Sequence, residues 1–148
     1  ASKLRRTNYQ KYLAELAEQY GVEDKIEFLG SLSGEEMKQA FLDANVFVLP
    51  STIENSPNSL GEAMLLGVPC VAADVGGVTT MMRHGLEGEV YPSTAPYMLA
   101  FYVENLFAQG EAAKAMGAAA HAHASVTHDP EKNLADLLEI YESLATEG

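Results

Sequence analysis

Short, continuously apolar runs alternate with longer amphipathic stretches, and this pattern constrains the fold more than any other feature. The clearest run is Val46-Phe47-Val48-Leu49, which Pro50 ends. Such a run is typical of a strand covered on both faces of a parallel sheet. Because strands and helices alternate along the chain, we predict the α/β class, with a three-layer, Rossmann-like parallel sheet of about four strands.

The spacing of the apolar residues places the remaining elements. We predict four strands, at Ile26–Leu29, Val46–Leu49, Cys70–Ala73 and Gly88–Tyr91. We predict helices over 3–20, after Ser33 as N-cap, from Ser59 as N-cap to Leu66, from Gly76-Gly77 to about His84, and over 96–108, 111–125 and 130–145. The last three make a helical C-terminal extension, about 96–145, of a single partial domain spanning 1–148. In the final helix, Leu134, Leu137, Leu138 and Tyr141 are expected to pack inward.

Composition excludes several classes of function. The formal net charge is −12 with nine Lys and Arg, whereas nucleic-acid binding needs a basic surface. The same charge argues against binding an anionic membrane surface. The one cysteine, Cys70, lies in an apolar run and has no internal disulfide partner. A cytoplasmic location follows as an expectation, with any membrane contact made through parts absent from this chain.

The segment from Pro50 to Met64 carries the chemistry. It leaves the end of a buried strand as a polar loop and enters a helix, at the sheet edge where α/β proteins bind ligands. The first amides of that helix suit a phosphate. Glu54 and Glu62 bracket this anion site. Since carboxylates repel phosphates, we expect them to bind neutral hydroxyls on either side, which suggests a nucleotide diphosphate sugar.

Longer motifs surround this segment. Glu54-x7-Glu62 continues into Glu-Ala-Met, then Leu-Leu-Gly-Val-Pro-Cys-Val-Ala and Asp-Val-Gly-Gly, preceded by Ile-Glu-Phe-Leu-Gly and followed by His-Gly-x-x-Gly. This order resembles the donor-binding core of the group 1 (family 4) retaining glycosyltransferases, which have the GT-B fold. The resemblance implies the C-terminal half of such an enzyme, which transfers a sugar in polysaccharide or glycolipid biosynthesis.

The resemblance also implies residue roles. Glu54 corresponds to the catalytic-site glutamate that contacts the transferred sugar, and Glu62 to the one that holds the ribose. The donor-binding set is completed by the amides of Asn58, Ser59 and Leu60 and by the pair Gly76-Gly77. No metal and no cofactor are implied. Two departures are Thr80, where the family has an acidic residue, and Asn55-Ser56-Pro57, where it has Gly-Phe-Gly.

The resemblance implies parts that this sequence lacks. These are two strands, a basic pair that neutralises the diphosphate, and the N-terminal acceptor domain that would act in cis. We therefore expect a binder of a UDP- or GDP-sugar that is inactive alone. With two strands absent, Ile26–Leu29 is expected either to move beside Val46–Leu49 or to leave a gap that a second copy fills, giving a homo-oligomer.

Other interpretations stay open at this point. The chain could be a Rossmann-like nucleotide-binding module without transferase activity, or a fragment that forms a swapped oligomer. Gly76-Gly77 could be only a turn before a helix. A metal site at His121, His123 and His128 is disfavoured, because residues two apart on a helix point in different directions.

Overall fold

The computed structural model describes residues 8–146, which belong to two compact units, Ala1–Ser33 and Gly34–Gly148. The first unit contains α1 (Asn8–Tyr20) and the short 3-10 helix η1 (Glu23–Lys25). Gly21 ends α1 at φ +62°. The helix predicted over 3–20 is thus confirmed from Asn8, while residues 3–7 lie outside the described residues. That 1–148 is a single partial domain stays a prediction.

The strand predicted at Ile26–Leu29 is wrong. The segment joins no sheet in the described part of the chain, and its apolar side chains are exposed, with Phe28 at 69% and Leu29 at 54%. An apolar run becomes a strand only where a neighbouring strand accepts its backbone hydrogen bonds. The move beside Val46–Leu49 and the filling of the gap by a second copy both stay predictions.

The second unit is built on a parallel sheet of three strands in the order β1 (Phe47–Leu49), β2 (Cys70–Asp74) and β3 (Glu89–Pro92). Three of the four predicted strands are confirmed. β2 is the central strand, and four of its five residues are buried. Such two-sided burial is why these runs are continuously apolar.

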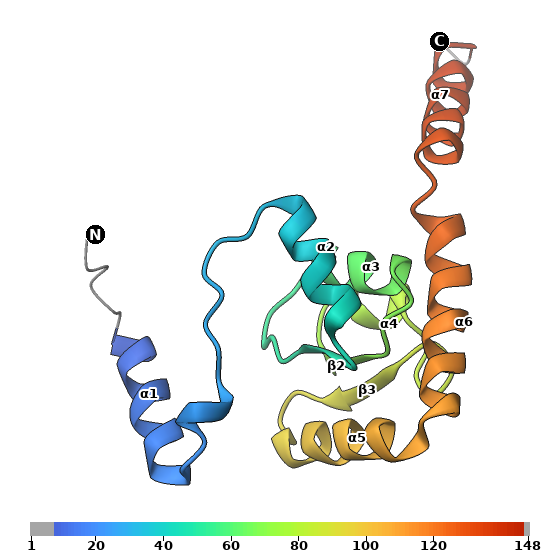
Figure 1. Cartoon of the computed structure of the whole chain (residues 1–148). Coiled ribbons are helices and arrows are strands. Elements are labelled where there is room, and N and C mark those ends of the chain that lie inside the picture. Colours follow the sequence, from blue (N-terminus) through green and yellow to red (C-terminus); the bar gives the residue numbers. More distant parts are fainter. Residues whose placement is uncertain (1–7, 147–148) are drawn as a thin grey trace. The chain divides into compact units, whose positions relative to one another are not determined.

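Helices cover both faces of this sheet, which confirms the predicted three-layer α/β class (Figure 1). Their bounds are α2 (Gly34–Asp43), α3 (Asn58–Leu65), α4 (Val78–Met81), α5 (Pro96–Gln109), α6 (Glu111–Thr127) and α7 (Pro130–Thr146). Cys70 and Ala72 of β2 pack with α2, α3, α4 and α6. Val71 and Ala73 face the opposite layer, formed by α5 and the first turns of α6.

The start of one predicted helix and the end of another need correction. Ser59 does not cap α3, because the helix already begins at Asn58 with Pro57 as N-cap and without a side-chain cap bond. The helix after Gly77 ends at Met81 rather than near His84, since Met82 is extended (φ −138°, ψ 126°). The segment that follows makes hydrogen bonds to a buried carboxylate instead of continuing the helix.

The final helix, α7, begins as predicted but packs differently. Asp129 Oδ1 accepts the backbone N–H groups of Glu131 at 2.9 Å and Lys132 at 3.1 Å, with Pro130 at the first helical position. All side chains over 131–145 are exposed. The predicted inward packing is therefore wrong for Leu134, Leu137, Leu138 and Tyr141, whose exposed fractions are 48–63%. No element of the described second unit covers this apolar face.

Candidate functional site

The candidate site lies at the C-terminal edge of the sheet, where β1 and β2 both end. After β1 the chain forms the loop over 51–57, and after β2 it turns through Gly76 and Gly77. The Gly77 N–H donates to the Asn55 carbonyl at 2.8 Å. Gly76 has φ +52°, and a side chain there would collide with the backbone carbonyl of Glu54. The glycine pair therefore allows the loop to lie directly against the turn.

Glu54 is half-buried in this loop. The Ser51 hydroxyl donates a hydrogen bond of 2.7 Å to its Oε1 atom. The other carboxylate oxygen, Oε2, has no partner among the described residues. Glu54 thus presents one unoccupied acceptor at the sheet edge, which suits a neutral hydroxyl donor.

Immediately beyond the loop, α3 presents its first backbone amides. The amides of Leu60 and Gly61 donate to the Pro57 carbonyl at 3.0 and 3.4 Å. Asn58 and Ser59 occupy the first two helical positions, where an N–H has no acceptor within the helix. Because the Leu60 amide already donates to the Pro57 carbonyl, the amides of Asn58 and Ser59 are better placed to donate hydrogen bonds to a phosphate. The Leu60 side chain is fully buried and fixes this helix start to the core.

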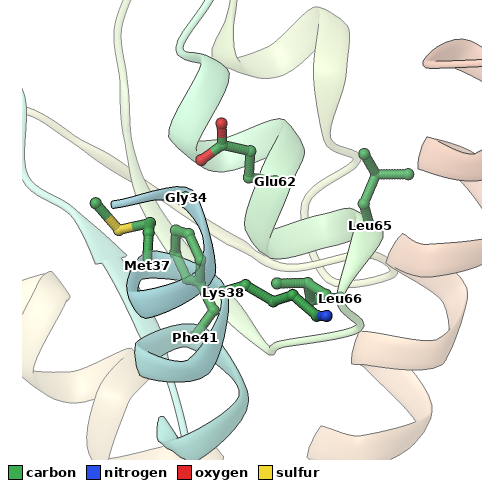
Figure 2. Close-up of a pocket in the computed structure, with 7 residues that line it drawn as sticks. All are labelled: Gly34, Met37, Lys38, Phe41, Glu62, Leu65 and Leu66. Atoms are coloured by element: carbon green, nitrogen blue, oxygen red, sulfur yellow. The ribbon is translucent and has the colours of Figure 1, made fainter. Parts of the chain in front are cut away.

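Glu62 lies one turn into α3, on its exposed side. It lines a largely apolar groove of about 330 Å³ between α2 and α3, which Met37, Phe41, Leu65 and Leu66 also line. Figure 2 shows the amino group of Lys38 beside Leu66 and directed away from the Glu62 carboxylate. The groove therefore combines an apolar wall with the Glu62 carboxylate, with which no Lys, Arg or His of the described residues forms an ion pair.

The structure thus brings most of the predicted site residues to one edge. Glu54, Gly76 and Gly77 are in direct contact through the loop backbone, and the α3 amides follow within a few residues. The glycine pair does form the turn before a helix, which was the alternative interpretation, and this turn also supports the Glu54 loop. Thr80 uses its hydroxyl locally, donating to the Gly77 carbonyl at 2.7 Å.

Glu87, in the turn before β3, is a buried carboxylate that was not predicted from the sequence. Its side chain is fully buried. The backbone N–H of Arg83 donates to Oε2 at 2.8 Å, and Arg83 Nε donates to Oε1 at 2.8 Å. Arg83 Nη2 also contacts Oε1, and His123 Nδ1 lies 3.0 Å from Oε2.

The environment of Glu87 sets its charge. Burial by itself raises the pKa of this carboxyl, but the hydrogen bonds from Arg83 and His123 outweigh burial and lower the pKa to about 2. An ionised, fully partnered carboxylate at the opposite edge of the sheet has a structural role. The four-residue spacing of Arg83 and Glu87 was the available signal, although this segment is not helical.

His121 of α6 and His128, the C-cap residue that follows α6, both contact protein groups of α3. His121 Nδ1 donates to the Leu65 carbonyl at 2.6 Å, and the His128 ring lies against Gly61. Over 8–146, no three His, Cys, Asp or Glu residues are grouped as metal ligands. Nor does that stretch contain a helix with the length and apolar character needed to span a membrane.

Comparison with known proteins identifies what this architecture resembles. The sequence model of the family described as glycosyl transferases group 1 matches residues 6–123. A D-inositol 3-phosphate glycosyltransferase of Corynebacterium urealyticum is 30% identical over 136 residues, or 92% of this chain. An uncharacterised glycosyltransferase of Methanocaldococcus jannaschii is 36% identical over 64% of the chain. The chain spans only 32% and 24% of these relatives.

Solved structures share the fold. A sucrose-phosphate synthase of Thermosynechococcus elongatus matches all of this chain with a TM-score of 0.87 at 22% identity, over 37% of its own length. The Anabaena protein HepE, solved in complex with UDP, matches 89% of the chain with a TM-score of 0.81 at 25% identity, again over 37% of its length. HepE has also been solved in complex with UDP-glucose.

Proposed function

Because the chain belongs to the group 1 glycosyltransferases, we propose that it is the part of such an enzyme that binds the nucleotide diphosphate sugar. The observation that carries the proposal is the contact between the Glu54 loop and the Gly76-Gly77 turn, directly before the α3 amides. Carboxylates that can accept hydrogen bonds from sugar hydroxyls and amides that can donate them to phosphates therefore lie at one sheet edge. A module that bound nucleotides alone would need one carboxylate for the ribose but no second carboxylate for a sugar.

Each group takes one part of the donor in this proposal. Glu54 Oε2 accepts a hydroxyl of the transferred sugar, which makes Glu54 the carboxylate at the reacting end. The amides of Asn58 and Ser59 donate to the diphosphate, where the helix dipole favours negative charge. Glu62 accepts the ribose hydroxyls. These amides suit an acidic chain, because they bind phosphate without a basic side chain.

The groove beside Glu62 is proposed to receive the nucleobase. Its walls are apolar, with Phe41 and Leu66 beneath, and its volume of about 330 Å³ suits a flat ring. A ribose held at Glu62 would direct the attached base along this groove. UDP is the first nucleotide to test, since HepE has been solved with UDP and with UDP-glucose.

Sugar transfer itself is proposed to need more than this chain. The relatives of this chain are about three times its length. The predicted acceptor domain and the basic pair that stabilises the departing diphosphate would belong to that remainder. We therefore expect donor binding but no turnover from the chain alone.

Calorimetric titration with UDP, UDP-glucose, GDP and GDP-glucose tests the proposal. We expect Glu62→Ala to weaken the binding of both UDP and UDP-glucose by about tenfold or more, since a hydrogen bond to a charged group contributes ~1.5–3 kcal/mol. Glu54→Gln should weaken UDP-glucose and leave UDP unchanged, because only the sugar reaches that carboxylate.

The control is Glu104→Gln, the same kind of change on the exposed side of α5, which should alter neither affinity. Absence of binding by all four ligands at millimolar concentration would overturn the proposal. Equal loss of UDP affinity in the Glu54 and Glu62 variants would overturn the division of roles.

A further inference from the structure

Among the described residues of the candidate loop, the side-chain hydrogen bond that orients a proposed ligand group is the one between Ser51 and Glu54. Ser51 lies two residues after β1, whose last residue, Leu49, is buried. Its hydroxyl is half-buried and has one proton, which it donates to Glu54 Oε1 at 2.7 Å. The donor is thus fixed by the sheet, while the acceptor belongs to the ligand-facing loop.

We infer that Ser51 is a positioning residue, which directs the Glu54 carboxylate so that Oε2 faces the sugar of the bound donor; this rests on the proposed function. A glutamate side chain has three rotatable bonds, and ordering it opposes binding. By holding Oε1 before the ligand arrives, Ser51 lowers the entropy lost on binding. The one hydroxyl proton on Oε1 also leaves Oε2 open as an acceptor.

The loop backbone is held without Ser51. The Gly77 N–H donates to the Asn55 carbonyl, and Gly76 allows the Glu54 carbonyl to pack against it. Removing the Ser51 hydroxyl should therefore release the carboxylate but leave the backbone in place. A positioning role thus predicts a loss confined to the sugar, and a merely structural role predicts equal losses for nucleotide and nucleotide sugar.

Titration of Ser51→Ala with UDP-glucose and with UDP separates these roles. We expect UDP-glucose to bind about threefold to tenfold more weakly, the range for one neutral hydrogen bond, and UDP to bind as before. Ser51→Thr, which keeps a hydroxyl, should restore most of the affinity. Thr52→Ala, which removes a hydroxyl from the exposed neighbour, is the matched control and should change nothing.

The double variant tests whether Ser51 acts through Glu54. In the Glu54→Gln background, adding Ser51→Ala should cause a smaller loss of UDP-glucose affinity than it causes in the wild type. Equal losses in both backgrounds, or equal losses of UDP and UDP-glucose, would overturn the inference. Unchanged UDP-glucose affinity in Ser51→Ala would also overturn it.

A ligand-free measurement keeps this inference separate from the proposed function. The ¹³C resonance of the Glu54 carboxyl should shift in Ser51→Ala and stay in place in Thr52→Ala. If the wild type binds neither ligand, the proposed function fails while the shift still reports the contact. If the resonance does not move, the positioning contact itself is refuted.

Discussion

Two carboxylates at opposite edges of the same sheet differ in how fully the protein satisfies them. Glu87, before β3, is fully buried and accepts hydrogen bonds on both oxygens from Arg83 and His123. Glu54, after β1, is half-buried and receives one hydrogen bond, from Ser51, on one oxygen. Both oxygens of the Glu87 carboxylate accept hydrogen bonds from the protein, whereas Oε2 of Glu54 has no donor among the described residues and can accept from a ligand.

The difference teaches where stability and binding are located. A buried charge is tolerated only when it is paired and hydrogen-bonded, so Glu87 belongs to the folded framework. A half-exposed carboxylate with an open oxygen adds little to folding and is available for a hydroxyl. We therefore expect substitutions at one edge to change the free energy of unfolding, and substitutions at the other to change affinity.

Gly76, which packs against the Glu54 loop, lies at the edge where substitutions are expected to change affinity, but its substitution should change the free energy of unfolding, and by the largest amount. Gly76→Ala should lower the free energy of unfolding by about 3 kcal/mol, because the new Cβ meets the Glu54 carbonyl and φ is +52°. Urea denaturation followed by circular dichroism measures it. Gly85→Ala is the control, since φ there is +73° and no atom lies within 4 Å of the added Cβ. Equal losses in both variants would show that strain, not the loop contact, is responsible.

Glu87→Gln tests the framework side of the comparison. We expect a loss of about 2 kcal/mol, because the neutral amide leaves donors of Arg83 and His123 poorly matched, while the exposed part of Arg83 stays hydrated. Glu54→Gln is the matched control and should stay within about 0.5 kcal/mol of the wild type. Comparable losses in the two variants, measured in urea, would remove the distinction between the edges.

Acidification sharpens the comparison further. The Glu87 pKa is lowered from 4.5 to about 2 in the folded chain, so its ionised form stabilises the native state above pH 4.5. That contribution, on the order of 3 kcal/mol at most, is lost as pH falls from 4.5 toward 2. The stability difference between the wild type and Glu87→Gln should therefore narrow below pH 4.5. A difference that stays constant from pH 7 to pH 3 would contradict this origin.

The sequence predicted those parts of the fold that depend on local pattern. Strand β2 is buried on both faces, and its uninterrupted apolar run reports that burial directly. The segment Ile26–Leu29 is also largely apolar, although Glu27 interrupts it, and it forms no strand among the described residues, because a local pattern does not show whether a neighbouring strand is available. The prediction that the apolar side of α7 packs inward is wrong for a similar reason. An amphipathic pattern shows that a helix has an apolar face, but it does not show that another element covers that face.

The candidate site was predictable from motif order, and its internal contacts were not. Glu54, Glu62 and the helix start follow from the strand, loop and helix sequence. The packing contact between the Glu54 loop and Gly76 joins residues that are distant in the chain, and so does the hydrogen bond between Glu87 and His123. Helix α3 starts one residue earlier than predicted, at Asn58, and its N-cap Pro57 (φ −72°, ψ 106°) offers no side-chain cap bond.

Helix α6 contributes to both cores, and this has a consequence for how the second unit unfolds. Ala120 and Ala124 pack in the core shared with α3, whereas Ala113 packs in the core shared with α5. Gly117 lies between them, and a side chain there would collide with the Gly67 carbonyl. Detaching α6 would thus expose both cores together. The two layers should unfold as one cooperative unit, with amides of β2 and α6 exchanging their hydrogens at a common, slow rate.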